Sequence, residues 1–489
     1  MASSNKDFIE VIMGEYSAKT FSLKMLVAKE ENKVIMAESD KDFIEVLFSF
    51  MLMPIASVVR NTRKWLRGDI GCLNNLYGSV ENLKTDYFED KMFQNMLLRP
   101  RSAADIHCQN LKLNLIGSGC FYVCENVNCR VISCYNIGNC QCGFELKNKL
   151  NISPHERLFP EEEDSFLKPT ARFIITDEIK VMAVADMADL TVLTELEKYG
   201  KIEERVIRIG EIEVLKLLKR SLTSRTSLSD TFLKPTNNSR EPLCMKYGPE
   251  GMNRSLNVKD FGIKIWSNIH IKLIFDKVNN VALYAVVKED FVNFLCGILT
   301  IPLGYIFNRF PLLSFSGCLG NLHKSIQGTD ISLFSCKKRK QILINPKLAP
   351  GLPYSSNLIA IEEANIASEC SKLESSISKC RYNSSTPNRR KAYLKEPATF
   401  LVMDNLEVKP LSPISVKLLL DKMMVPLSDI CEKEMILDGD KALRLLVASL
   451  ASEHALTTTF LSKNEHLNCD CLDFLQLIWG GKRTGLKGC

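Results

Sequence analysis

The strongest constraint on the fold is an internal repeat, because two related halves must build the same local structure twice. Residues 23–54 align without gaps with residues 271–302, and eight of these 32 positions are identical. Downstream, Gly71–Leu76 matches Gly317–Leu322 at five of six positions. We name this unit A in the first half and unit A′ in the second.

A second unit recurs separately from the first. Phe173–Asp177 returns as Phe400–Asp404, and residues 214–233 return as 442–461 with ten identities in 20 positions. We name these units B and B′. The order along the chain is A, B, A′, B′, which predicts a tandem duplication of a two-unit module. Two copies are too few for a stacked solenoid.

Local patterns indicate what each unit contains. In unit A, two short β-type runs flank a polar turn at 29–33, which predicts a hairpin. Asp40 then precedes an apolar run with helical spacing, so a helix should begin near residue 41, and Pro54 should kink or end it. In unit B, we expect strands at 173–176, 179–184 and 206–209, and helices at 188–199 and 211–222.

Locally paired strands combined with helices predict an α+β fold made of a hairpin-plus-helices unit A and a mixed α/β unit B. The expected units are A over 21–88, B over 171–235, A′ over 262–335 and B′ over 398–463. The remaining segments are an N-terminal extension over 1–20, a Cys-rich insertion over 105–146, a linker over 336–397 and a C-terminal tail over 464–489. Lys6–Val11 repeats Lys41–Val46 letter for letter, and we attach no function to it.

The insertion holds seven of the 18 cysteines, between positions 108 and 142. Cys124, Cys129, Cys140 and Cys142 form two thiolate pairs that could hold a structural zinc ion in a small knuckle. The second pair has C-x-C spacing in place of C-x2-C, and the second half has no equivalent cluster. A loop with unpaired thiols is the alternative, and a redox or catalytic role is a third. The spacing leaves all three open.

Targeting signals, hydropathy and charge indicate the compartment and the partners that the chain is expected to have. The N-terminus has no secretory pattern and a chain this long does not need disulfides, so we expect the cytoplasm or the nucleus. Lys337–Lys340 is either a nuclear-import patch or a solvated loop. Phe291–Phe307 is uncharged, but its 17 residues include Pro302 and fall short of a bilayer span, so we expect no membrane helix. The net charge of +6 argues against a nucleic-acid partner.

No familiar reaction motif is present in the sequence. There is no phosphate-binding Gly-x4-Gly-Lys loop, no His-Glu-x2-His helix and no nucleophile elbow, so we predict no catalytic or cofactor-binding residue. Asp177 and Asp404 match between the halves and stand where a hairpin turn is expected, which favours a structural use. His323 replaces Tyr77 at a matched position, which indicates a packing or surface role.

Several of these motifs resemble a plant family called domain of unknown function 674. They are Leu23–Val27 leading into Asp42-Phe43, Met53-Pro54, Gly71–Tyr77, Phe400–Leu406 and Lys409–Ser412. The resemblance implies a plant protein from a lineage-expanded family without an established activity. It also implies a Cys insertion that ends in Cys-Pro-x-Cys, and this chain lacks that proline and one spacer residue.

Two functional hypotheses follow, together with a weaker third. The first is a non-enzymatic interaction or scaffold protein with protein partners, because the duplicated module carries no recognisable reaction chemistry. The second is a small-molecule binder or enzyme whose site lies between the two halves. The third is a zinc-knuckle protein that binds nucleic acid, against which the modest charge argues.

Overall fold

The computed structural model describes most of the chain, and all structural statements below concern the described part. That part comprises residues 19–63, 70–117, 119–126, 132–136, 144, 146, 148–150, 165–169, 171–184, 199–233, 268–310, 317–353, 361–364 and 392–461.

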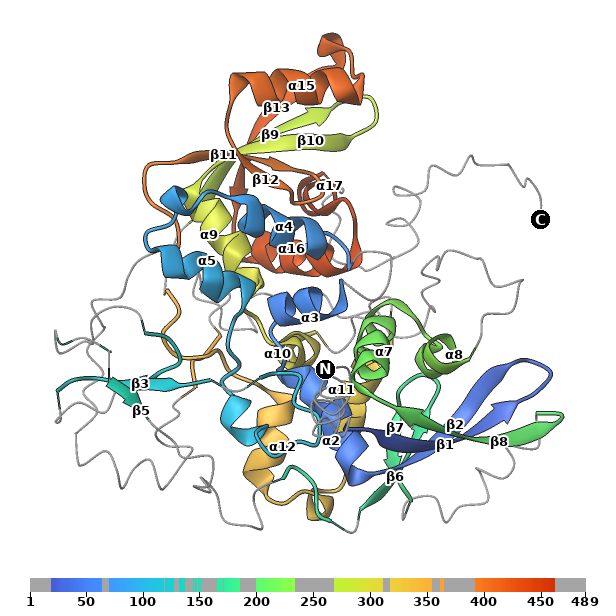
Figure 1. Cartoon of the computed structure of the whole chain (residues 1–489). Coiled ribbons are helices and arrows are strands. Elements are labelled where there is room, and N and C mark those ends of the chain that lie inside the picture. The colour runs from blue at the N-terminus through green and yellow to red at the C-terminus, as the bar shows by residue number, and fades with distance from the viewer. Residues whose placement is uncertain are drawn as a thin grey trace, which may run out of the picture.

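Two five-stranded antiparallel sheets dominate the molecule (Figure 1). The first has the order β7-β6-β2-β1-β8 and the second has the order β12-β11-β10-β9-β13. The first sheet consists of β1 (Phe21–Ala28), β2 (Lys33–Asp40), β6 (Arg172–Thr176), β7 (Val181–Ala183) and β8 (Ile202–Ile209). The second consists of β9 (Ile269–Asp276), β10 (Val281–Lys288), β11 (Thr399–Met403), β12 (Val408–Pro410) and β13 (Ile430–Leu437). We call each sheet with the helices packed on it the first and the second lobe.

The sheets have the same topology, strand for strand. Each begins with the hairpin predicted for unit A, here β1–β2 and β9–β10. Each is extended on one side by the first two strands of unit B or B′ and closed on the other by its last strand. The mixed α and β architecture is therefore as expected, and shared topology is what a duplicated module requires, although the duplication itself stays an inference from the sequence.

Most of the predicted local structure in unit A is found. Alternate side chains of β1 are buried, as expected for a strand with one face on the core. Helix α2 (Lys41–Ser49) begins where Asp40 accepts a hydrogen bond from the Phe43 amide at 3.2 Å. A 3-10 turn, η1 (Phe50–Leu52), ends it before Pro54, and α3 (Ile55–Thr62) starts directly afterwards. Pro54 thus separates two helices.

The described helices follow the same order in the two halves apart from α15, because the matching stretch between β7 and β8 lies mostly outside the described residues. After α2 and α3, the first half contains α4 (Leu73–Asn82), α5 (Lys91–Leu98), α7 (Glu211–Thr223) and α8 (Ser227–Phe232). The second half contains α9 (Glu289–Ile298), α10 (Leu303–Arg309), α11 (Leu319–Gly328), α12 (Lys337–Ile344), α15 (Pro413–Met423), α16 (Gly439–Ala451) and α17 (Ala455–Phe460).

The two halves exchange helices. In Figure 1, α4 and α5 from the first half lie in the upper lobe beside α9 and α16, and α11 and α12 from the second half lie in the lower lobe. Contacts between α4 and β12 and between α11 and β7 agree with this placement. Each lobe therefore combines the sheet and several helices of one half with two helices from the other half.

The two chain segments that lead into the exchanged helices run side by side around Pro54 and Pro302, at a point that we call the crossing. Pro54 and Pro302 form an isolated antiparallel bridge there. The Ile55 amide donates to the carbonyl of Ile301 at 2.9 Å, and the Leu303 amide donates to the carbonyl of Met53 at 3.0 Å. These reciprocal bonds relate the two halves by an approximate two-fold axis.

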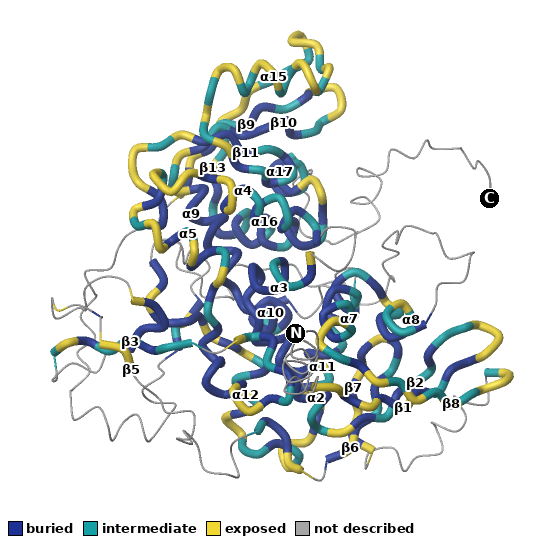
Figure 2. Tube along the Cα trace, in the orientation of Figure 1, coloured by how far each residue is buried: buried dark blue, intermediate teal, exposed yellow. Residues whose placement is uncertain are grey.

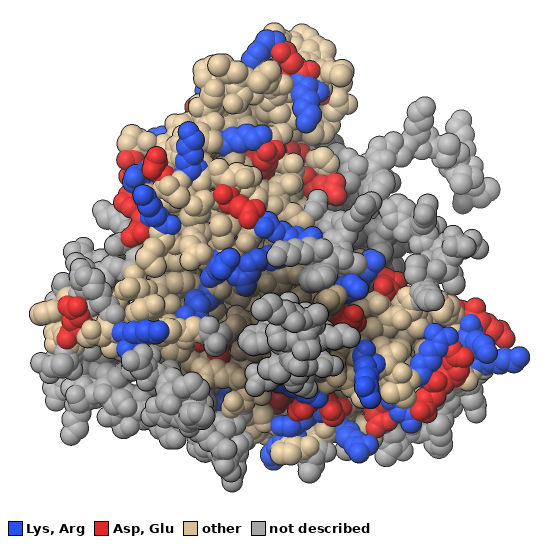
Figure 3. All heavy atoms as spheres, in the orientation of Figure 1, with Lys and Arg blue, Asp and Glu red and all other residues tan. Residues whose placement is uncertain are grey.

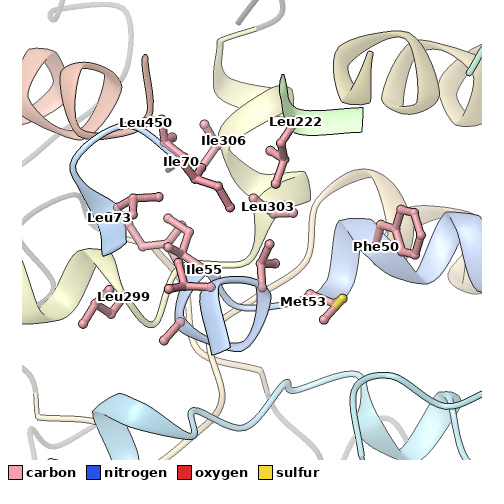
Figure 4. Close-up of a cluster of buried hydrophobic side chains, with 14 of the residues drawn as sticks. Phe50, Met53, Ile55, Ile70, Leu73, Leu222, Leu299, Leu303, Ile306 and Leu450 are labelled. Atoms are coloured by element: carbon pink, nitrogen blue, oxygen red, sulfur yellow. The ribbon is translucent and has the colours of Figure 1, made fainter. Parts of the chain in front are cut away.

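Apolar side chains from both halves fill the crossing. Figure 4 shows Ile70 and Leu73 of the first half near Leu450 of the second, and Leu222 near Ile306. All five belong to one buried cluster that continues into both lobes. The core is therefore shared, and burial of this apolar surface stabilises both halves together.

Several expectations differ in detail from the structure. The last strand of unit B starts at Ile202 and not near 206, because its exposed and half-buried residues still pair with β1. The helix expected over 188–199 falls almost entirely outside the described residues. The uncharged run at 291–307 is broken between α9 and α10, and no described helix is long and apolar enough to cross a membrane.

Lys337–Lys340 is not a solvated loop, because it forms the first turn of α12. Arg339 is only 2% exposed and its guanidinium lies 5.6 Å from the ring centre of Phe166. The Lys340 ammonium donates to two carbonyls at the end of α11. Both side chains contribute to packing within the first lobe.

Candidate functional site

The predicted metal ligands lie mostly outside the described residues. Cys124 follows directly after β3 (Phe121–Val123), which pairs with β4 (Ile132–Ser133) and β5 (Asn148–Leu150) in a small sheet. Cys129, Cys140 and Cys142 are not described. Within the described part of the chain, no three His, Cys, Asp or Glu residues are grouped to hold a metal ion. The four-thiolate site therefore stays a prediction.

The repeat-matched Cys72 and Cys318 have a structural role at the exchange. The Cys72 amide donates to the carbonyl of Ser449 at 2.8 Å, and its thiol donates to the carbonyl of Ser452 at 2.9 Å. Burial raises the pKa of the Cys72 thiol to about 12, so the thiol stays protonated and is a poor nucleophile. In the same way, burial raises the pKa of Cys318 to about 11.

The matched acids Asp177 and Asp404 cap helices, and so hold each lobe together. The Asp177 carboxylate accepts bonds from the amide and the hydroxyl of Ser229 in α8, both at 2.8 Å. Asp404 accepts the same two bonds from Thr457 in α17, at 2.8 and 2.7 Å. A local structural use is thus found, although the partner is a distant helix and not the hairpin turn.

The described residues form a cavity of about 460 Å³ in the second lobe, at the side of the sheet where α15 packs. Its wall is apolar where β10, β11 and the end of α15 meet, and its rim is polar where the loops meet. The lining residues are Asp276, Asn279, Val281, Ala282, Leu283, Met403, Asp404, Asn405, Met423, Val425, Glu453 and His454. All of them belong to the second half, so this cavity does not lie between the halves.

The polar rim combines three carboxylates and one imidazole. His454 Nδ1 lies 3.0 Å from Asp404 Oδ2, and this hydrogen bond raises the pKa of His454 against the opposing effect of burial. Asp276 accepts bonds from the amides of Val278 and Asn279, and the hydrogen bonds to Asn279 lower its pKa. The cavity rim is therefore net negative, because three carboxylates outnumber one imidazole.

Three of these four side chains differ in charge from the matched residues of the first lobe. At the offsets that align the repeats, Asp276 corresponds to Ala28, Glu453 to Arg225, and His454 to Thr226. Only Asp404 has an acidic counterpart, which is Asp177. The common fold requires the matched aspartate but not the other three side chains.

Helix α15 carries an exposed apolar surface beside the cavity. Val416, Leu419, Leu420 and Met423 face inward, onto a small cluster with Leu283 and Leu401. The outer surface includes Ile414 at 72%, Leu418 at 64%, Met424 at 87% and Leu427 at 77% exposure. No residue of α15 is buried, and Figure 2 draws the helix in teal and yellow. We call these four residues the α15 surface.

The charged residues are sparse around α15 compared with the other end of the molecule. Figure 3 shows interleaved Lys, Arg, Asp and Glu along the edge that carries β1, β2 and β8, whereas the end that carries α15 is mostly tan with a few charged side chains. Lys417 and Asp421 form an exposed ion pair on α15. On the first sheet, Lys24 and Glu204 form an exposed ion pair at 3.1 Å. The α15 surface is thus the more apolar of the two ends in this view.

Comparison with protein-family models identifies the family of this chain. The model described as "Protein of unknown function (DUF674)" matches residues 17–440, from just before β1 into the first turn of α16. The chain belongs to the DUF674 family. The resemblance read from its motifs is therefore confirmed. Comparison with curated proteins and with solved structures gave no match.

Sequence reasoning did not find the cavity of this DUF674 chain. His454 and Glu453 stand in no recognisable motif of the sequence. A usable signal existed, since Glu453 and His454 differ from Arg225 and Thr226 within an otherwise well-matched segment. These two differences lie next to the shared aspartate in the folded lobe, because His454 contacts Asp404.

Proposed function

We propose that this DUF674 chain is a non-enzymatic interaction protein whose docking site is the α15 surface with the adjoining cavity. Its partner is a protein segment that presents apolar side chains together with at least one lysine or arginine. The observation that carries the proposal is the combination, in the second lobe, of exposed apolar residues and an acidic cavity rim.

The apolar part supplies contact area. Ile414 and Leu418 stand four residues apart on one face of α15, and Met424 and Leu427 continue the surface past the end of the helix. Exposed apolar groups of this kind favour association because their contact removes apolar area from water. The methionines around the cavity, Met403 and Met423, have flexible side chains that can adapt to a partner.

The charged part selects the partner. Asp276, Asp404 and Glu453 face the cavity, and His454 is the only basic group among its lining residues. A lysine or arginine side chain of a partner complements this rim, while an acidic segment is repelled. Charge complementarity therefore supports a basic amphipathic segment as the occupant.

The chemistry of the cavity favours binding over catalysis. His454 is oriented by Asp404, as a general base would be, but the lining residues include no Ser, Thr, Cys, Tyr or Lys to act as a nucleophile. Asp404 is also committed to capping α17. A small-molecule ligand is the alternative occupant that the experiment distinguishes.

The test uses a synthetic peptide with leucines at helical spacing and flanking lysines, labelled for fluorescence anisotropy. The full chain should bind it, and Leu418→Lys should weaken binding by roughly tenfold or more, because the new charge faces the peptide lysines. Val206→Lys is the matched control, since Val206 is a 61% exposed apolar residue on β8 of the other lobe. It should leave affinity unchanged.

A second comparison tests whether binding requires positive charge on the peptide and negative charge on the cavity rim. The same peptide with glutamates in place of lysines should not bind, and Glu453→Gln should weaken the lysine peptide several-fold at low salt. Equal affinity for both peptides, or no effect of Leu418→Lys, would contradict the proposal. Binding of a lysine-like alkylammonium ion without the peptide would instead favour a small-molecule ligand.

A further inference from the structure

The contact between the halves is built from the same residues twice. Two of the exchanged helices, α4 and α11, follow directly after a Gly-Cys pair, and we call α4 and α11 with these pairs the Gly–Cys helices. In the second lobe, the Cys72 amide and thiol bond the carbonyls of Ser449 and Ser452 at the end of α16. The Asn75 side chain donates to the carbonyl of Asn405 at 3.2 Å.

The first lobe repeats each of these bonds. The Cys318 amide donates to the carbonyl of Ser221 at 2.7 Å, and its thiol donates to the carbonyl of Ser224 at 3.0 Å. The Asn321 side chain donates to the carbonyl of Glu178 at 3.0 Å. The bonds satisfy polar groups at the ends of α16 and α7 that otherwise would be buried without a partner.

The edge strand of each lobe is hydrogen-bonded by the Gly–Cys helix of the other half. The Val408 amide of β12 donates to the hydroxyl of Ser79 at 2.8 Å, and the Val181 amide of β7 donates to the hydroxyl of Ser325 at 2.9 Å. An edge strand leaves backbone groups unpaired, and here a serine from the opposite half pairs one of them.

The approach is close enough to require glycine. A Cβ atom at Gly71 would lie 2.4 Å from the carbonyl oxygen of Ser449, and one at Gly317 would lie 2.1 Å from that of Ser221. By contrast, a Cβ at Gly78 or Gly328, within the same two helices, meets nothing within 4 Å. The Gly-Cys motif is therefore explained by docking onto the other half and not by the helix itself.

We propose that this contact is a pairing surface that does not depend on the covalent connection between the halves, so that one half pairs with the complementary half of another copy of this chain. The partner chemistry is a Gly–Cys helix received by the serine-terminated end of α7 or α16. Exchange of identical elements is a low-cost route to association, and here two matched docking sites already exist.

The test uses the full chain with a protease site inserted between residues 250 and 251. After cleavage, size exclusion and native mass spectrometry should show a one-to-one complex of the two halves. Cys72 and Cys318 should stay unmodified by a thiol reagent in that complex, because both are buried at the contact. Halves that elute separately would overturn the proposal.

Pairing between copies is tested by mixing cleaved protein in labelled and unlabelled form, followed by mild denaturation and dilution. About half of the re-formed complexes should then be hybrids of one labelled and one unlabelled half, as random re-pairing requires. Complexes that keep only their original partners would contradict it.

A pair of variants tests whether the Gly-Cys motif itself makes the pairing contact. Gly317→Ala should reduce the recovered complex several-fold after cleavage, whereas Gly328→Ala, in the same helix but in open space, should leave the recovery unchanged. Equal recovery for both variants would overturn the assignment of the Gly-Cys motif to pairing.

Discussion

At the residue scale, single positions decide how closely the two halves approach. Gly71 has a φ of +51°, in the region that favours glycine, and a Cβ atom there would collide with the backbone of Ser449 and Leu450. The neighbouring Cys72 thiol donates to a backbone carbonyl and is inert at neutral pH. The pair therefore provides fit and hydrogen bonding without reactivity.

Gly71→Ala should destabilise the protein by on the order of 3 kcal/mol, because it combines an unfavourable backbone conformation with a collision against a backbone oxygen. Gly78→Ala in α4 is the matched control and should be neutral or slightly stabilising, since alanine favours a helix interior. Denaturant unfolding measures both. Similar stability for the two variants would refute a close approach at Gly71.

The buried Asp177 predicts a pH dependence of stability. Burial raises the pKa of Asp177 to about 6, from 3.8, despite the opposing hydrogen bonds from Ser229. The folded state thus binds the Asp177 proton more tightly than the unfolded state does. The contribution of protonated Asp177 to the free energy of unfolding is therefore present at low pH and is lost as the pH rises through about 6. Roughly two pKa units correspond to about 3 kcal/mol.

Asp177→Asn should remove this titration while it keeps an acceptor for the Ser229 amide. The free energy of unfolding of the wild-type chain, relative to that of the variant, should therefore fall between about pH 4 and about pH 6. Urea unfolding across that range gives the difference. Parallel pH profiles would show that Asp177 does not titrate as argued.

At the element scale, equivalent helices differ in how they start. Asp40 caps α2 with its side chain, whereas the matched Lys288 precedes α9 without a side-chain hydrogen bond to it. Both helices nevertheless begin directly after the second strand of their hairpin. Packing against the sheet therefore suffices to start the helix, and the cap adds stability to one of the two.

Asp40→Ala should cost about 1 kcal/mol, because the Phe43 amide loses its acceptor. Lys288→Ala should change the free energy of unfolding by much less, since no cap is lost. Chemical denaturation of the two variants provides the comparison. An equal cost at both positions would mean that the cap contributes nothing specific.

The Cys-rich insertion is the element whose chemistry is still a proposal. We propose that Cys124, Cys129, Cys140 and Cys142 hold a structural zinc ion, as their grouping in the sequence suggests. Protein purified without chelator should release about one zinc ion per chain when its thiols are modified. The double variant Cys140→Ser/Cys142→Ser should release none, and Cys336→Ser, outside the insertion, should be unaffected. Absence of zinc in the wild-type protein would refute the site.

At the scale of the whole molecule, neither half is an independent lobe. The hairpin of unit A pairs with unit B, but α4, which also belongs to unit A, packs against β12 and α9 of the second lobe. The same holds for unit A′ with the roles reversed. The lobe that carries the cavity is therefore completed by the first half, and Asn75 bonds the carbonyl of the cavity residue Asn405.

Short-range structure was predictable from the sequence, but the exchange was not. The hairpins, the start of α2 at Asp40 and the α7 helix follow from patterns within about 15 residues. The docking of α4 depends on which of two similar surfaces it meets, and the ends of α7 and α16 offer the same serines at positions 221 and 449. Sequence patterns that are identical in both halves cannot specify which half is the partner.

The exchange is the central claim, and photo-crosslinking from position 75 tests it most directly. A photoreactive residue placed at Asn75 in the full chain, irradiated at a dilution where the chain is monomeric, should attach within the segment 404–410 that follows β11. Without exchange, the same position would face the equivalent turn near Glu178, which contacts Asn321 in this structure. Crosslinks mapped by mass spectrometry to 404–410 would confirm the exchanged lobes, and crosslinks mapped to 177–183 would contradict them.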